Sequence, residues 1–580
     1  MKIDLCKLPF SRYGSYGALS YDQHTQELAI RFVYHGFVKS KRKLFKIIPF
    51  KEGKPLTYRV HAEPWVLTME TNEGSIHFYW KGKGELVIWG NGPELRIEYL
   101  GAGEEGGFAT QDSMMSWRIV DPTSTSFIRL FTLEGMLEGH TSFQLAMNPD
   151  GTAGKRHTCP EAYFHLSGPK EFLLHMGFGQ MELDLEYPKA DPVNDLEEAK
   201  HQFEGFRESF RQTMTSPAEY REAVETAVYV LWSSVVEPEG KIKRPAMLMS
   251  KNWMTNVWSW DHCFNALALA RPNPNLAWDQ MQVVFDHQLP NGQLPDYVNH
   301  AEALASFTKA PIHGWAYMLL VEKGFELSSD KALLVYEQLS RWTDWWFSYR
   351  DSDRDGICQY NHGFDGCWDN ASVFDAGIPI ESPDLTAYLL LQMAMLERLA
   401  HALNRTEVAK LWNTRYLLTM EKFIEHSWDE GNRQFFTLQT AKQIQVESGS
   451  LINWMPVVLG DRLPKRIWSS IVTALSDESQ FLTQTGLATE SRSSSSYSDG
   501  DSYWRGPTWA PVVYMVVDGL RRGGEQELAR TIAHRFCQTV KESGAMYENY
   551  ESSTGQGLSD PAYTWTASVF LLLLDEYLGD

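Results

Sequence analysis

The sequence has no uninterrupted apolar run of about 18 residues, so no segment is predicted to cross a membrane. Its first residues, MKIDLCKLPFSRYGSYG, lack the apolar stretch of a secretion signal, and we therefore expect a cytoplasmic protein. Only six cysteines are present, none with CxxC spacing, so neither a disulfide framework nor a zinc site is indicated. Lysine and arginine (53) are also fewer than aspartate and glutamate (74). A formal net charge of −21 makes nucleic acids and anionic membranes poor partners and favours a neutral or cationic ligand.

Aromatic residues, in contrast, are abundant. They make up 13% of the chain and include 21 tryptophans and 25 tyrosines. Flat rings of this kind either fill hydrophobic cores or line ligand clefts. The 580 residues also exceed what one hydrophobic core usually organises, so we expect two domains or one large barrel with an accessory domain.

The first third of the chain has the pattern of β-structure. Short runs rich in β-branched and aromatic residues, such as ELAIRFVYH, KLFKIIPF and SIHFYW, alternate with Gly, Pro and Asn turns. This alternation is typical of antiparallel sheets. We predict an N-terminal antiparallel β-sandwich domain over residues 1–190, followed by a charged helical linker over residues 191–215.

The remainder of the chain is predicted to be helical, because apolar residues recur there at helical spacing. The expected helices lie near residues 217–235, 259–271, 274–288, 310–323, 329–348, 383–403, 405–426, 451–459, 463–474, 507–520, 524–543 and 561–578. Twelve helices in six hairpins indicate an (α/α)6 barrel. We therefore predict a mostly α protein whose catalytic domain, residues 216–580, is such a barrel.

Four motifs in the loops between the expected helices concentrate Trp, Asp, Asn, Gly and Tyr. They read NVWSWDH at 256–262, FDGCWDN at 364–370, SYWRGPTW at 502–509 and MYENY at 546–550. Loops on a rigid scaffold commonly carry binding and catalytic residues. We therefore interpret these four loops as the parts of one functional site.

Together, the motifs resemble glycoside hydrolase family 63, through WSWDH, GCWDN followed by SPDLTAY, YWRGPTW and YENY in that order. The family includes mannosylglycerate and glucosylglycerate hydrolases and processing α-glucosidases. The resemblance covers residues 250–570, and the β-rich part is similar to the family only in kind. It implies an (α/α)6 barrel and an inverting mechanism, with Asp369 as general acid and Glu548 as general base. Residues 371–373 read Ala-Ser-Val where relatives often carry Ser-Pro-Arg, so leaving-group contacts do not carry over.

The chemistry of inversion requires such a pair independently. One protonated carboxyl must lie beside the glycosidic oxygen, and one carboxylate must hold a water on the opposite face, about 6.5–9.5 Å away. The ring of Trp368 next to Asp369 is expected to raise the pKa of the acid by desolvation. Glu548 has the polar neighbours Tyr547 and Asn549, which we expect to keep it ionised. The alternative for each carboxylate is an exposed loop residue or a helix cap.

Substrate binding is assigned mainly to the same loops. Tryptophan rings can stack on sugar C–H faces, and their alternative is packing between helices. Asp261 can accept two sugar hydroxyls, or it can serve as a helix N-terminal carboxylate. Arg505 can neutralise a carboxylate or form a structural ion pair. The candidate substrate-binding residues are Trp258, Trp260, Asp261, His287, Gln288, Asp365, Trp368, Asn370, Trp504, Arg505, Gly506, Trp509 and Trp565.

An acidic loop at Asp351, Asp353 and Asp355 matches the opening of a calcium loop, in which alternate carboxylates and a central glycine wrap a hard cation. The twelfth position is His362 instead of a bidentate Glu, so a bound ion needs a ligand from elsewhere. A plain acidic turn is the alternative. We expect no cofactor for catalysis, and any calcium ion here to be structural.

The sequence thus predicts an inverting glycoside hydrolase that cleaves an α-linked glucoside or mannoside of a small saccharide or glycosyl conjugate. Another enzyme on the same barrel, such as a trehalase, an epimerase or a lyase, is the first alternative. The second is a sugar-binding protein without catalysis, which would need neither Asp369 nor Glu548. The sugar, its linkage, the aglycone and the oligomeric state stay open.

Overall fold

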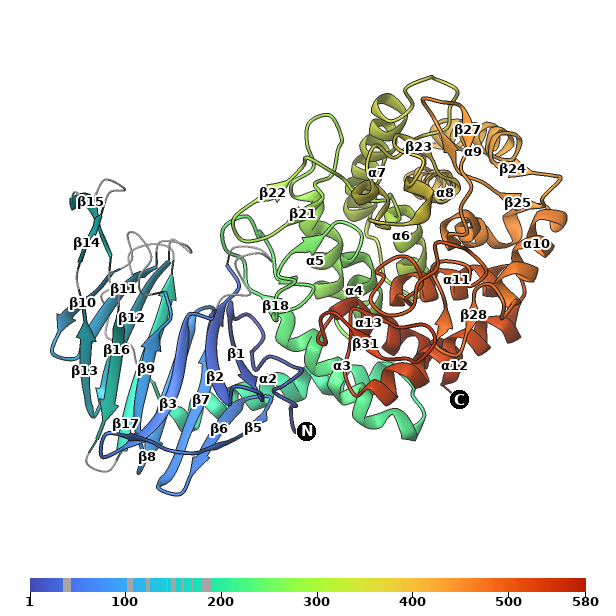
Figure 1. The fold of residues 1–580 in the computed structure, drawn as a ribbon. Helices are drawn as coiled ribbons and strands as arrows, with labels where there is room; N and C mark the ends of the chain where they lie inside the picture. Colours follow the sequence, from blue (N-terminus) through green and yellow to red (C-terminus); the bar gives the residue numbers. More distant parts are fainter. Residues whose placement is uncertain are drawn as a thin grey trace.

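The computed structural model describes residues 1–579 except 35–42, 102–107, 122–125, 143, 148–152, 159–160, 169–170 and 180–189. The chain forms an antiparallel β region at its N-terminal end and a helical domain beyond it, as Figure 1 shows. Within the described residues, no helix has the length and apolarity needed to cross a membrane.

The β region consists mainly of two antiparallel sheets. The first has the order β1 (Gly17–Asp22), β2 (Glu27–Phe32), β3 (Phe45–Lys51), β9 (Glu94–Tyr99), β16 (Ala162–Ser167) and β13 (Met136–Thr141), with β4 (Lys54–Pro55) paired to β3. The second has the order β10 (Phe108–Ser113), β11 (Ser116–Asp121), β12 (Ser126–Glu134), β17 (Glu171–Gly179), β8 (Glu85–Asn91), β7 (Gly74–Lys81), β6 (Val66–Thr71) and β5 (Arg59–Glu63). A separate hairpin pairs β14 (Gln144–Met147) with β15 (Ala153–Thr158).

Strand alternation explains how these two sheets share a core. In β9 the buried residues are Leu95, Ile97 and Tyr99, because successive side chains point to opposite faces of a strand. Rings from the two sheets meet directly. Phe32 of β2 stacks on Phe178 of β17 with ring centroids 3.4 Å apart. The apolar faces of the two sheets are therefore turned toward each other.

Helix α2 (Pro192–Thr213) connects the β region to the helical domain. It begins at Asp191, whose side chain accepts a hydrogen bond from Asn194 N, and a proline follows at the first helical position. Its Phe203 packs edge-on against Trp232 of α3 (Arg221–Ser234), with centroids 5.2 Å apart, and also lies near Trp65 of the β region. One helix face thus contacts both parts of the molecule.

Six elements of the helical domain pack in a closed sequence of neighbours. Helix α4 packs on α6, α6 on α8, α8 on η4, η4 on α11, α11 on α13, and α13 on α4. Their bounds are α4 (His262–Leu269), α6 (His313–Glu322), α8 (Pro383–Ala402), η4 (Leu451–Arg462), α11 (Ala510–Arg522) and α13 (Thr564–Leu573). All residues of α4 and α13 are buried, as expected for helices that are apolar on every side.

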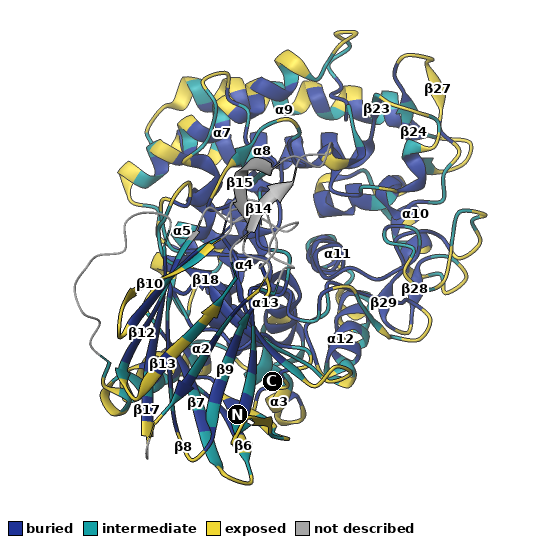
Figure 2. Ribbon diagram, turned by 60° about the vertical axis from the view of Figure 1, so that its left-hand side comes forward, coloured by how far each residue is buried: buried dark blue, intermediate teal, exposed yellow. Residues whose placement is uncertain are grey.

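A second set of helices covers the first from outside. Helices α3 and α5 pack on α13 and α4, α7 and α9 on α8, α10 on η4, and α12 on α11. Figure 2 shows exposed faces on α7 and α9, whereas α8, α11 and α13 are buried. The remaining bounds are α5 (Pro274–Phe285), α7 (Ser329–Tyr349), α9 (Thr406–Ser427), α10 (Lys465–Ser476) and α12 (Gln526–Ser543).

One element differs from the prediction of an α-helix. Residues 451–462 form a 3-10 helix, η4, with Pro456 inside it and a break at Gly460, where φ is +57°. A proline inside a helix removes one backbone donor and clashes with the preceding turn, which prevents a regular α-helix.

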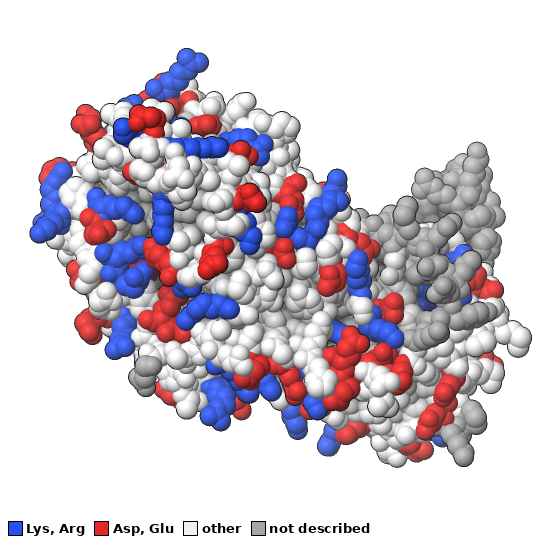
Figure 3. All heavy atoms as spheres, turned by 180° about the vertical axis from the view of Figure 1, so that it is seen from behind, with Lys and Arg blue, Asp and Glu red and all other residues white. Residues whose placement is uncertain are grey.

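On the face of the molecule drawn in Figure 3, positive and negative side chains are interspersed.

Candidate active site

A pocket of about 340 Å³ lies where loops from the four motifs converge with two further loops. Its lining is rich in aromatic rings and carboxylates. The lining residues are Met254, Trp258, Trp260, Asp261, Asp296, Tyr297, Leu304, Phe307, Lys309, Phe364, Cys367, Asp369, Tyr503, Trp504, Glu548, Tyr563 and Trp565. The structure therefore brings together seven of the candidate site residues: Trp258, Trp260, Asp261, Asp369, Trp504, Glu548 and Trp565.

Asp369 follows the short 3-10 turn η2 (Gly363–Gly366). The chain leaves this turn through Cys367, which has a φ of +65° although it is not a glycine. Non-glycine residues in this left-handed region are uncommon and concentrate at functional sites. Burial raises the pKa of Asp369, and the nearby Lys309 and a hydrogen bond from Tyr503 oppose that rise. The carboxyl is therefore suited to carry a proton.

Glu548 precedes β30 (Asn549–Tyr550), and its side chain is buried. Its backbone is fixed from two sides. Glu548 N donates to Asp560 O at 2.8 Å, and Trp565 Nε1 donates to Glu548 O at 3.0 Å. Burial raises the pKa of Glu548 well above its ordinary value, and the negative charges of Asp560 and Asp261 raise it further.

This differs from the expectation that polar neighbours keep Glu548 ionised. The flanking residues do not solvate its carboxylate. Tyr547 is engaged through its backbone, since its N–H donates to Tyr550 OH and its carbonyl oxygen accepts from Thr566 Oγ1. Asn549 is fully buried. Burial and the neighbouring carboxylates, and not the residues next to it in sequence, therefore have the main effect on Glu548.

Asp261 lies at the N-terminus of α4 but makes no capping hydrogen bond with its side chain. Its Oδ1 accepts a hydrogen bond from Tyr563 OH at 3.3 Å, and both residues line the pocket. Burial raises the pKa of Asp261 to about 7. Its geometry therefore fits the pocket interpretation better than the helix-cap alternative.

A buried ion pair, Asp296 with Lys309, lies in the pocket wall, and we did not predict it. Lys309 Nζ lies 3.1 Å from Asp296 Oδ1 and donates to Phe364 O at 2.9 Å. Burial alone would lower the pKa of Lys309, but Asp296 and Asp369 outweigh it and raise the pKa. No motif contains either residue. The sequence indicates only that an Asp and a Lys lie in loops that also contain aromatic residues.

A comparison with known proteins identifies the family of this chain. Residues 254–566 match the family described as the mannosylglycerate hydrolase MGH1-like glycoside hydrolase domain. The chain belongs to this family. The resemblance to glycoside hydrolase family 63 is thereby confirmed, and the protein is a glycosidase.

Individual relatives of this glycoside hydrolase are distant. The mannosylglycerate hydrolase of Rubrobacter radiotolerans is 23% identical over an alignment of 430 residues, covering 57% of this chain and 96% of the relative. A family 63 mannosylglycerate hydrolase from Thermus thermophilus, solved with glucose, covers 60% of this chain and 98% of its own, with a TM-score of 0.52 and 20% identity. A bacterial glucoamylase solved with acarbose covers 98% and 93%, with a TM-score of 0.62 and 11% identity. The two solved structures establish a shared fold.

Two predicted stacking residues of the glycoside hydrolase lie behind the pocket wall. Trp509 stacks in parallel on Trp504, with centroids 4.0 Å apart, and donates from Nε1 to Tyr503 O. Trp368 packs on Trp504 with centroids 4.7 Å apart. Neither Trp368 nor Trp509 is part of the pocket lining. They pack against Trp504, which does line the pocket, and this favours the alternative of structural packing over stacking on sugar.

Three further candidates brace the loops of the glycoside hydrolase. Asn370 joins two motifs, because its Nδ2 donates to Ser502 O and its Oδ1 accepts from Trp504 N. Arg505 Nε donates to Asn370 O at 2.8 Å, and its guanidinium forms an ion pair with Asp375. These contacts support the structural alternative for Arg505. At Gly506, φ is +150° and a Cβ would lie 2.5 Å from Ser498 O, so the position requires glycine.

The last three candidates also lie outside the pocket lining. Asp365 accepts hydrogen bonds from Thr308 N and Asn361 N, both at 3.1 Å. His287 Nε2 is bonded to Lys241 O at 2.7 Å. Gln288 donates to two backbone oxygens, those of residues 292 and 338. Each side chain thus forms hydrogen bonds with the backbone of a neighbouring segment.

The three aspartates of the acidic loop lie close together, and Glu381 and His426 approach the loop from distant segments. Ligand atoms of Asp351, Asp353 and Asp355 lie within 4.8 Å of one another, and so do those of Asp355, Glu381 and His426. Glu381, in β23 (Ile380–Glu381), is 1% exposed, and its Oε1 has no hydrogen-bond partner among the described residues. Its Oε2 lies 2.7 Å from His426 Nε2.

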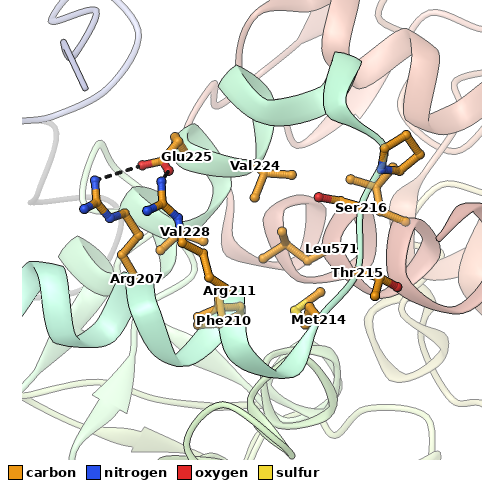
Figure 4. A pocket seen from close by; sticks show the side chains of 12 residues that line it. Arg207, Phe210, Arg211, Met214, Thr215, Ser216, Val224, Glu225, Val228 and Leu571 are labelled. Carbon is orange, nitrogen blue, oxygen red and sulfur yellow. Dashed lines mark hydrogen bonds and ion pairs between the residues drawn. The ribbon is translucent and has the colours of Figure 1, made fainter. Parts of the chain in front are cut away.

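A different cavity, of about 440 Å³, lies between α2, α3 and α13 and holds none of the motif residues. Figure 4 shows Arg207 and Arg211 of α2 turned toward the same carboxylate, Glu225. Apolar side chains such as Leu571 form the opposite wall. We interpret this cavity as the packing space between the connecting helix and the helical domain.

Proposed function

We propose that the protein is an inverting glycosidase in which Asp369 is the general acid and Glu548 the general base. The observation that carries this proposal is that the two carboxyls line one aromatic-walled pocket although they come from distant loops. Inversion needs two carboxyls that face the reacting bond from opposite sides. Burial raises the pKa of both groups. This favours a protonated acid and gives the base, once ionised, a high proton affinity.

The proposed reaction is a single displacement. Asp369 transfers its proton to the glycosidic oxygen, and the bond between that oxygen and the anomeric carbon breaks. Glu548 takes a proton from a water molecule on the opposite face, and the water oxygen bonds to the anomeric carbon. Asp369 ends as a carboxylate and Glu548 as a carboxylic acid. A net proton exchange through solvent restores both.

The proposed substrate is an α-linked glucoside or mannoside with a small aglycone. A pocket of about 340 Å³ is at the small end of ligand sites. Trp258, Trp504 and Trp565 supply aromatic surface for a sugar, and Asp261 supplies an acceptor for its hydroxyls. The names of relatives that hydrolyse mannosylglycerate support a glycosyl conjugate.

We also propose that the helical domain is an (α/α)6 barrel and the β region a β-sandwich, with domains at residues 1–190 and 216–580 and a linker at 191–215. The closed sequence of six packed elements, each with outer helices, supports the barrel. The ring contacts between the two sheets support the sandwich.

A structural calcium ion at Asp351, Asp353 and Asp355 is proposed as well. Calcium takes six to eight oxygen ligands, and a carboxylate usually closes the loop. Glu381 supports the proposal because it brings a buried carboxylate with an unbonded oxygen close to Asp355, in a loop whose sequence lacks a bidentate Glu. The ion has no part in the proposed reaction.

The test of the proposed function is a hydrolysis screen with purified protein. Candidate substrates are α-linked disaccharides, mannosylglycerate, glucosylglycerate and aryl α-glycosides, with release of free sugar as the readout. We expect turnover of at least one α-glycoside by the wild type and loss of that turnover in Asp369→Asn. Equal sugar release by the wild type and the variant would overturn the assignment of the acid.

A further inference from the structure

Arg31 connects the β region to the loop beside the active site. It lies on β2, is 6% exposed, and donates to Asn252 O through Nη1. Its Nη2 donates to Lys251 O at 3.3 Å and to Asn252 Oδ1 at 3.4 Å. The guanidinium of Arg31 therefore holds residues 251–252, which precede the WSWDH motif at 258–262.

The side chain of Asn252 in turn donates a hydrogen bond to Asp560. Its Oδ1 accepts hydrogen bonds from Ser250 Oγ at 2.9 Å, Asn252 Nδ2 at 3.1 Å and Ala562 N at 2.9 Å. Its Oδ2 is buried and has no hydrogen-bond partner among the described residues. A fully buried carboxylate needs compensation for its charge. Burial raises the pKa of Asp560, and its three hydrogen bonds together with the positive charge of Arg31 offset only part of that rise.

Asp560 in turn contacts the proposed base. Its backbone oxygen accepts the hydrogen bond from Glu548 N at 2.8 Å. Its carboxylate is the charged neighbour with the largest effect on Glu548, where it adds to the effect of burial and raises the pKa. The other ionisable groups that act on Glu548 are Asp261 and Asp369, and those of Tyr503 and Tyr563 lie in the same pocket wall.

We propose that Asp560, which Arg31 of the β region holds in place through Asn252, is a positioning residue for Glu548 that anchors its backbone and strengthens it as a base. The inference rests on the proposed role of Glu548. Asp560 acts through Glu548 and does not line the pocket. A general base gains strength when a neighbouring negative charge disfavours its ionised form, because its proton affinity rises.

The proposal gives the β region a part in catalysis. The family match begins at residue 254, and 60% of this chain already covers 98% of the Thermus thermophilus mannosylglycerate hydrolase. Arg31 lies outside the family match, whereas Asp560 and Glu548 lie inside it. In this chain, a strand outside the family match thus holds Asn252, whose side chain donates to the carboxylate of Asp560.

The experiment measures the pH dependence of kcat/KM and the value of kcat on a hydrolysed α-glycoside. Four variants of the full chain are compared: Asp560→Asn, Arg31→Met, Arg31→Lys and the double variant Arg31→Met/Asp560→Asn. Arg12→Met is the matched control. Arg12 is also a buried arginine of the β region, but it bonds Trp80 O and Gln202. Thermal melting of every variant reports on folding separately.

In Asp560→Asn we expect the acidic limb of the pH profile to move to lower pH, because a negative charge beside Glu548 is gone. The plateau of kcat should fall on the order of tenfold, since a weaker base takes up the proton of water less well. Arg31→Met should move the limb in the same direction, because Asp560 without its cation takes up a proton more readily. Arg31→Lys should retain the wild-type limb, and Arg12→Met should leave limb and plateau unchanged.

The double variant decides whether Arg31 acts through Asp560. We expect Arg31→Met to move the limb no further once Asp560 is already Asn. An unmoved limb in Asp560→Asn, or an equal shift from Arg31→Met in both backgrounds, overturns the inference. If Arg31→Met does not fold, Asp560→Asn and Arg31→Lys still decide. Failure of the proposed function is distinguishable from failure of this inference, because Glu548→Gln would then hydrolyse the substrate at the wild-type rate.

Discussion

The ammonium of Lys309 lies 3.1 Å from Oδ1 of Asp296, inside the wall of the pocket that Asp369 also lines. Removing one partner of a buried ion pair leaves an uncompensated charge and costs about 3–5 kcal/mol. We expect Lys309→Met to destabilise the protein by about this amount. The double variant Lys309→Met/Asp296→Asn should recover much of the loss. Urea unfolding of both variants checks this, and equal stability of the two would contradict it.

The proposed acid and base predict the same outcome for two substitutions. We expect Asp369→Asn and Glu548→Gln each to lower kcat by about 10² or more, because each removes one proton transfer. Steady-state kinetics with a hydrolysed α-glycoside measures the effect. Asp375→Asn serves as the control, since Asp375 pairs with Arg505 outside the pocket lining and should retain most of the activity. Near-wild-type turnover in either test variant removes that residue from the mechanism.

The stereochemistry of the product tests the mechanism itself. An α-glycoside should release the β-sugar first, because water attacks from the face opposite the leaving group. Proton NMR of the early hydrolysate, recorded before mutarotation, identifies the anomer. Release of the α-sugar first would indicate a double displacement, and the base role of Glu548 would then be wrong.

Burial of Asp384 predicts a pH dependence of stability. Its Oδ2 accepts from Tyr360 OH at 2.9 Å, and burial raises its pKa to about 7. The group protonates more readily in the folded state than in the unfolded chain, where the pKa is about 3.9. Its contribution to the free energy of unfolding is therefore complete below about pH 4 and is lost as the pH rises through about 7. The free energy of unfolding should fall across this window.

Asp384→Asn should reduce that fall, measured by denaturant unfolding at a series of pH values. The control is Asp330→Asn, which removes an exposed carboxylate from the first turn of α7. The control should leave the pH dependence unchanged. The same slope in wild type and Asp384→Asn would show that this carboxyl does not contribute.

The calcium proposal predicts a metal-dependent melting temperature. Binding to the folded state alone stabilises it by mass action, so added calcium should raise Tm and a chelator should lower it. Glu381→Gln should weaken both responses, because it removes one carboxylate from the site. Glu407→Gln, an exposed change on α9, should leave them intact. A Tm that changes with neither calcium nor chelator would mean that the loop is a plain turn.

Much of the helical architecture could be predicted because apolar periodicity marks buried helix faces directly. The family could be predicted because four motifs keep their order, and the family match confirms it. Periodicity is blind to backbone detail, however. The segment at 451–459 has a helical apolar pattern, but Pro456 and Gly460 convert it into a 3-10 helix with a break.

The layering of the site could not be predicted from residue types. Trp504 and Trp509 belong to one motif and have the same chemistry, yet Trp504 lines the pocket and Trp509 lies stacked behind it. Lys309 and Asp296 belong to no motif, and only the fold brings their charges together. Glu381 similarly joins the acidic loop across a gap in sequence that no local pattern spans.

The two hydrogen bonds that α13 makes around Glu548 have a consequence for biosynthesis. Trp565 donates to Glu548 O and Thr566 donates to Tyr547 O, and Trp565 is the last of the pocket-lining residues in the sequence. A nascent chain that stops before Thr564 contains Asp369 and Glu548 but lacks the donors that fix the loop carrying Glu548. On a ribosome, the enzyme therefore acquires an assembled site only when α13 emerges.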